Sequence, residues 1–158
     1  MDEKERKLKA NDPAPDFVLK DQDGKDFQLS GHSGKRVLLS FHPLAWTAVC
    51  TQQMQSLEVN HAAFKGMNTV PVGLSVDSVP SKKAWADSIG IRQVQLLADF
   101  WPHGGVAILY DIFREKNGFS ERANILVDEK GQIALLKTYP LSQLPAIEEI
   151  LAIIRGLN

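Results

Sequence analysis

An α/β fold, in which a central mixed β-sheet carries helices on both faces, is the architecture that the sequence predicts. Short apolar segments alternate along the chain with segments whose apolar residues recur every three or four positions. The length of 158 residues and the apolar fraction of 44% are ordinary for one globular domain. We therefore expect residues 1–158 to form a single domain, with residues 1–10 as a flexible, charged N-terminus.

The first expected elements are a β-hairpin and a central strand. Two short apolar runs, residues 17–19 and 27–29, flank an Asp23-Gly24 turn, which is the pattern of an N-terminal hairpin. Residues 37–41 are almost wholly apolar and are followed by Pro43. Such a run, bounded by turn signals, is typical of a strand covered on both faces.

The rest of the chain alternates helical and strand patterns. Cys50, Met54, Leu57, His61 and Phe64 recur at helical spacing, which predicts a helix from about residue 48 to 64 with Cys50 in its first turn. The later expected elements are a strand over 70–76, a helix capped near Ser78 that carries Trp85 and Ile89, a strand over 94–97, a short helix over 106–112, a hairpin of 123–127 and 133–136, and a C-terminal helix whose apolar stripe runs from Leu144 to Ile154. This order is that of a thioredoxin-like fold.

Composition argues against several classes of partner. The 18 basic and 19 acidic residues nearly balance, so neither nucleic acid nor a membrane is an expected partner. The N-terminus lacks the apolar run of a secretory signal, and no segment approaches the ~20 apolar residues of a membrane span. The four histidines lack the spacing of a metal site, and the Gly104-Gly105 pair lacks the rest of a phosphate-binding loop. We expect a cytoplasmic protein without a cofactor or metal.

The sequence contains one cysteine, which excludes an internal disulfide and a Cys-x-x-Cys redox pair. Cys50 is expected where a strand passes into a helix N-terminus, the place where open α/β sheets bind ligands. The helix dipole and the unpaired N–H groups there favour a nucleophilic thiolate. Thr47 can donate a hydrogen bond to a peroxide or to sulfur, and Pro43 can help to shape a narrow, shielded pocket.

Pro43, Thr47 and Cys50 match the Pro-x-x-x-Thr-x-x-Cys signature of the peroxiredoxins, the alkyl hydroperoxide reductase / thiol-specific antioxidant family, and the chain resembles this family along nearly its whole length. Residues 14–17, 23–25 and 99–104 also resemble family segments. The resemblance implies a thiol-dependent peroxidase that reduces hydrogen peroxide or small organic hydroperoxides. The stretch 121–131 resembles the segment that supplies an arginine opposite the cysteine, which assigns that role to Arg122. A guanidinium stays charged and can hold thiolate and peroxide together.

Several positions depart from the family pattern. Gln53 stands where Glu is common, so the carboxylate that helps to orient the arginine is missing; either activity is weaker or the amide substitutes for it. His42 replaces the usual Tyr or Phe, as in some one-cysteine members, and is a candidate hydrogen-bond partner of Cys50. Trp46 replaces Phe or Tyr. No second cysteine is present at Gln55 or near the C-terminal end, so the resemblance implies the one-cysteine type.

In that mechanism a sulfenic acid on Cys50 is reduced by an external thiol, which could be thioredoxin, glutaredoxin or glutathione, or another small thiol. The segments around Trp46 and Trp101 correspond to regions that meet across family interfaces, so a homodimer is expected; these rings can also wall the pocket. Two alternatives stay open. One is a thioredoxin-fold redox sensor or binding protein with weak turnover, and the other is a holdase-like or structural oligomer.

Overall fold

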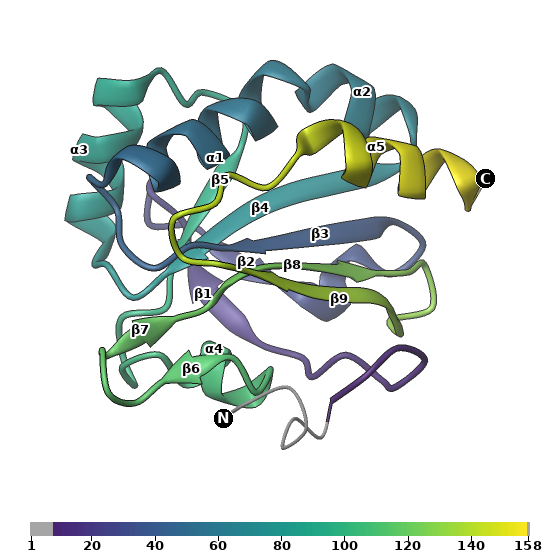
Figure 1. Cartoon of the computed structure of the whole chain (residues 1–158), viewed down its shortest axis with the longest axis horizontal. Coiled ribbons are helices and arrows are strands. Elements are labelled where there is room, and N and C mark those ends of the chain that lie inside the picture. The colour runs from purple at the N-terminus through teal and green to yellow at the C-terminus, as the bar shows by residue number, and fades with distance from the viewer. Residues whose placement is uncertain (1–7, 158) are drawn as a thin grey trace.

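The computed structural model describes residues 8–157 and forms the predicted mixed sheet with helices on both faces (Figure 1). Residues 1–7, most of the expected flexible N-terminus, lie outside the described residues. In chain order the elements are β1 (Val18–Lys20), β2 (Asp26–Gln28), a 3-10 helix η1 (Leu29–His32), β3 (Arg36–Phe41), α1 (Ala48–Val59), α2 (His61–Gly66), β4 (Thr69–Ser75), α3 (Val79–Ile89), β5 (Gln95–Ala98), α4 (Gly105–Leu109), β6 (Phe113–Arg114), β7 (Phe119–Ser120), β8 (Arg122–Val127), β9 (Ile133–Tyr139) and α5 (Ile147–Gly156).

The five-stranded sheet has the order β5-β4-β3-β8-β9. β3, β4 and β5 run parallel, whereas β8 is antiparallel to both β3 and β9. The expected N-terminal hairpin is present as β1-β2. The predicted fold class is therefore confirmed. The hairpin predicted for residues 123–127 and 133–136 is present as β8 and β9 at one end of the sheet.

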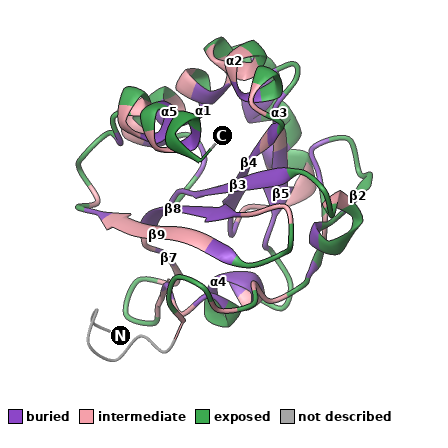
Figure 2. Cartoon of the chain, turned by 90° about the vertical axis from the view of Figure 1, so that its right-hand side faces the viewer, coloured by how far each residue is buried: buried purple, intermediate pink, exposed green. Residues whose placement is uncertain are grey.

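Two apolar cores lie on the two faces of this sheet. Leu38 points into a core with residues of α1, α2, α3 and α5, whereas its neighbours Val37 and Leu39 point into a core with α4 and the β1-β2 hairpin. This alternation follows from the two-residue period of a strand. Figure 2 shows the consequence: β3 and β8 are buried, and the edge strand β9 is only partly covered.

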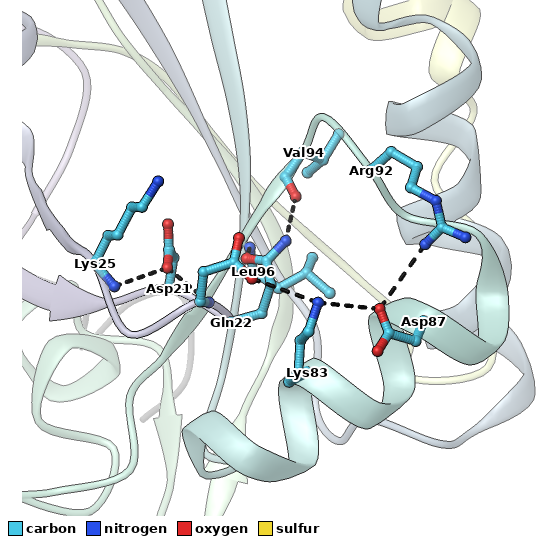
Figure 3. Close-up of polar contacts among 9 residues, drawn as sticks. Asp21, Gln22, Lys25, Lys83, Asp87, Arg92, Val94 and Leu96 are labelled. Atoms are coloured by element: carbon cyan, nitrogen blue, oxygen red, sulfur yellow. Dashed lines mark hydrogen bonds and ion pairs between the residues drawn. The ribbon is translucent and has the colours of Figure 1, made fainter.

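The turn of the β1-β2 hairpin covers the other edge strand, β5 (Figure 3). The Gln22 side chain donates to Val94 O at 3.0 Å and accepts from the Leu96 N–H at 2.8 Å, as a neighbouring strand would. Nearby, Lys83 of α3 pairs with Asp87 at 3.2 Å. The two Gln22 bonds satisfy backbone groups at an edge that would otherwise be open to pairing with another chain.

Some element boundaries differ from the sequence predictions. The helix expected over residues 48–64 is two helices, because the chain leaves helical geometry at Asn60 (φ −98°, ψ 12°). The helix expected over 106–112 ends at Leu109, and a small β6-β7 hairpin follows it. The last helix starts at Ile147 and not near Leu144, because Leu144 precedes a proline, a position that disfavours helical geometry.

The parallel strands place their carboxyl ends at one edge of the sheet. β3 ends at Phe41, β4 at Ser75 and β5 at Ala98, and the polar residues His42, Asp77 and Asp99 follow them closely. Among residues 8–157, no helix is long and apolar enough to cross a bilayer.

Candidate active site

The β3-α1 loop places Cys50 in the first turn of α1. Trp46 has a left-handed backbone (φ 71°), and Thr47 then occupies the N-cap position with extended geometry. Asp77 anchors the loop, because its carboxylate accepts a hydrogen bond from the Ala45 N–H at 2.8 Å. Cys50 is a free thiol with 0% of its surface exposed. The sulfur is therefore in the first turn of a helix, where the dipole favours an anion, and it is shielded from solvent.

The Arg122 guanidinium lies against this sulfur. Its Nη1 is 3.4 Å from Cys50 Sγ and donates to Gln53 Oε1 at 2.7 Å. Its Nε and Nη2 both donate to the carbonyl of Leu141, at 3.0 and 2.7 Å. The planar guanidinium is thus fixed by Gln53 and by the Leu141 carbonyl, and its buried positive charge lies next to the thiol.

Gln53 connects this cation to the end of β3. While its Oε1 accepts from Arg122, its Nε2 donates to Ser40 Oγ at 2.7 Å and to Phe41 O at 3.2 Å. An amide is suited to this position because it is acceptor and donor at once. The amide therefore binds Arg122 and the end of β3 at the same time.

Pro43 and Thr47 belong to the loop that joins β3 to α1. The Thr47 side chain is exposed, and its hydroxyl donates to Leu44 O at 2.8 Å, so in this state its proton is directed at the loop and not at the sulfur. Thr47 makes no side-chain capping bond. Pro43 follows His42 and is buried.

His42 is fully buried and contacts a lysine that the sequence reasoning missed. His42 Nε2 is 2.9 Å from Lys82 Nζ of α3, and its Nδ1 is 3.4 Å from Ser40 O. Burial, together with the charges of Lys82 and Arg122, lowers the pKa of His42 well below its usual value. The ring is therefore neutral, and we assign its proton to Nδ1 because Nε2 faces a donor.

Lys82 itself is 0% exposed. Burial lowers the pKa of Lys82 to about 7, although the negative charges of Asp77, Cys50 and Asp99 act in the opposite direction. The sequence held one signal of this, because Lys82 precedes Trp85 by three residues and so shares its helix face. In the structure Trp85 is fully buried.

Trp46 and Trp101, the two tryptophans predicted to line the pocket, are more exposed than Trp85. Trp46 is 55% exposed and donates from Nε1 to Ser81 Oγ at 3.0 Å, which ties the β3-α1 loop to α3. Trp101 is 80% exposed, so its ring faces solvent and not the buried Cys50 cluster. The structure thus brings Cys50, Gln53 and Arg122 together and leaves Trp101 apart. Between residues 8 and 157 no group of three or more His, Cys, Asp or Glu side chains is arranged to hold a metal ion.

The chain is similar to known proteins of one family. The AhpC/TSA family model matches residues 10–136. The chain is 39% identical over 121 residues to alkyl hydroperoxide reductase E of Mycobacterium tuberculosis, covering 76% of this chain and 78% of the relative. It is 30% identical over 159 residues to peroxiredoxin-1 of Gallus gallus, covering 92% and 77%. The solved structure of reduced Plasmodium vivax 2-Cys peroxiredoxin is similar at a TM-score of 0.85 and 29% identity, covering 94% of this chain and 81% of the other.

Proposed function

Because this chain belongs to the AhpC/TSA family of peroxiredoxins and is a thiol-dependent peroxidase, we propose that Cys50 is its reacting thiol and Arg122 the cation that activates it. The observation that carries the proposal is the buried contact of 3.4 Å between Arg122 Nη1 and Cys50 Sγ. In a site shielded from water, a fixed cation stabilises the thiolate and the charge that develops on the peroxide oxygens more strongly than it would in water.

The reaction begins when the Cys50 thiolate attacks one oxygen of the peroxide. An S–O bond forms, the O–O bond breaks, and the departing hydroxide or alkoxide takes a proton to leave as water or alcohol. Cys50 becomes a sulfenic acid, and the peroxide is reduced by two electrons. Thr47 takes part as an acceptor for the peroxide O–H, since its own proton is directed to Leu44 O. Pro43 excludes water from the reacting atoms.

An external thiol completes the cycle. It attacks the sulfenic acid, releases water and forms a mixed disulfide, and a second thiol then restores the Cys50 thiol and leaves as a disulfide. This one-cysteine route is supported by the sequence, which holds no other cysteine. Thioredoxin, glutaredoxin or glutathione, and other small thiols are the candidate reductants. Since Sγ is fully buried, the first turn of α1 must open to admit such a thiol.

A homodimer in the cytoplasm is the setting we propose for this activity. Exposed apolar side chains follow the carboxyl ends of β3 and β5, at one edge of the sheet, and include Leu44, Trp46, Phe100 and Trp101. Exposed apolar surface of this kind is typical of protein–protein contacts. Sedimentation equilibrium tests the homodimer: a mass of two chains would support it, and a mass of one chain would contradict it.

Stopped-flow fluorescence of the reduced protein with hydrogen peroxide or an alkyl hydroperoxide tests the reaction. Trp85 is a suitable reporter, since its Nε1 donates to Thr51 Oγ1 at 3.3 Å in the first turns of α1. We expect a fast change in proportion to peroxide, with loss of one thiol per chain, and none with Cys50→Ser. Reaction no faster than that of an ordinary free thiol would contradict the proposal and favour a redox sensor or binding protein.

A further inference from the structure

In the part of the chain that the structure describes, the buried Lys82 makes no hydrogen bond to Cys50, Arg122 or Gln53, yet it lies in a cluster with His42. Lys82 Nζ donates to His42 Nε2 at 2.9 Å and lies 5.4 Å from the centre of the Trp85 ring. The His42 ring is 5.3 Å from the same Trp85 ring. Lys82, His42 and Trp85 therefore form one closed cluster between α3 and the β3-α1 loop. Each of the three side chains is 0% exposed.

Folding alone gives no reason for an ammonium group in this place. Lysine is almost never fully buried without a partner of opposite charge, because removing it from water is unfavourable. Here the partner is a neutral imidazole. The next residue, Lys83, shows the ordinary alternative, since its side chain is 51% exposed and pairs with carboxylates at the surface. Perturbed, buried ionisable groups of this kind concentrate at functional sites.

The negative groups that act on Lys82 come from three parts of the fold. Asp77 follows β4 and Asp99 follows β5, but both carboxylates already accept backbone N–H groups, from Ala45 and from the start of α4. The thiolate of Cys50 on α1 is the third negative group, and it raises the pKa of Lys82. A charged Lys82 and a Cys50 thiolate therefore attract each other.

We propose that Lys82 is a positioning residue of the peroxidase reaction, which holds His42 in the neutral, Nδ1-protonated form and supplies, beside Arg122, a second buried positive charge that favours the Cys50 thiolate. The inference rests on the proposed role of Cys50 as the reacting thiol. His42 lies directly before Pro43, so fixing its ring also fixes the end of β3, where Gln53 binds Ser40. The two cations thus act on the thiol from different elements, α3 and β8.

Lys82→Met is the variant that tests this role, because methionine keeps an unbranched, apolar side chain and removes the charge and the donor. Lys83→Met is the matched control, since it removes a lysine charge from the same helix at the surface. The measurements are the second-order rate constant with hydrogen peroxide and the ultraviolet absorbance of the thiolate, each as a function of pH. At pH 6, where most Lys82 side chains are charged, we expect Lys82→Met to react about tenfold more slowly, as for the loss of one nearby opposite charge, and Lys83→Met to react within about twofold of the wild type.

The pH profile separates this role from a purely structural one. Lys82 loses its charge as the pH rises through about 7, so the rates of wild type and Lys82→Met should converge in alkaline buffer. A structural defect would leave the slower rate at every pH. Equal rates and equal thiolate absorbance for wild type and Lys82→Met across the range would overturn the inference.

Two further results keep the test decisive. If Lys82→Met does not fold, Lys82→Gln, which keeps a donor for His42 but no charge, takes its place, and its thiolate absorbance should fall at pH 7; an unchanged absorbance would overturn the electrostatic role. If the wild type itself fails to react with peroxide, the proposed role of Cys50 fails, whereas the thiolate absorbance still decides whether Lys82 favours the anion.

Discussion

Replacing Lys82 should make the stability of the protein less dependent on pH. The pKa of Lys82 is about 7 in the folded protein and 10.5 as its ordinary value, which describes the unfolded chain. Between these two values the unfolded state binds more protons than the folded state, so the free energy of unfolding rises with pH. At ~1.4 kcal/mol per pKa unit, the difference corresponds to a penalty of about 5 kcal/mol at pH 6 that falls to about 2 kcal/mol at pH 9.

Lys82→Met removes this penalty because methionine does not titrate. We therefore expect the variant to be more stable than the wild type, and its advantage to shrink by roughly 3 kcal/mol between pH 6 and pH 9. Guanidinium denaturation of both proteins at the two pH values, followed by circular dichroism, measures the difference, and Lys83→Met again serves as the control. An advantage that is equal at the two pH values would refute the account of Lys82 as a buried, titrating group.

Three other substitutions test the site around the sulfur. Arg122→Lys keeps the charge but cannot contact Cys50, Gln53 and the Leu141 carbonyl together, so the second-order rate with peroxide should fall about 100-fold; a fall of less than threefold would contradict the role of the planar fork. Gln53→Leu removes the bonds of Gln53 to buried groups of Arg122 and of β3, and chemical denaturation should show a loss of about 1–3 kcal/mol, whereas unchanged stability would count against these bonds. Thr47→Val should slow the peroxide reaction at least tenfold with little change in unfolding midpoint, and Thr47→Ser should retain the rate; equal loss in both would argue against the hydroxyl.

The sheet was predictable because its strands carry their own signal. Residues 37–41 form a continuous apolar run, and in the structure every residue of β3 is buried. The errors fall where local pattern and backbone geometry disagree. The spacing from Cys50 to Phe64 continues through Asn60, so it could not show that the helix is interrupted there. Elements as short as β6 and β7, with two residues each, have no readable period.

The contact between Cys50 and Arg122 was predictable only from the family motif, since 72 positions separate the two residues. The groups that fix the arginine were harder to foresee. One is the Leu141 carbonyl, a backbone atom that any residue type could supply. The other is the amide of Gln53, which the sequence presented as a departure from the family pattern. Its role depends on both ends of the amide, which only the positions of Ser40 and Phe41 reveal.

Lys82 was missed because residue type argued against its burial, and this same conflict is the strongest reason to assign it a function. The net stability of a typical domain is about 5–15 kcal/mol, so a penalty of about 5 kcal/mol for one side chain is large. A methionine of similar length would avoid it while keeping the packing against Trp85. A residue retained only for folding should slow nothing when it is replaced by a side chain that stabilises the protein. Lys82→Met is instead expected to raise the free energy of unfolding and to slow the reaction of Cys50. A gain in stability together with a loss of rate is the result that a role in the chemistry requires.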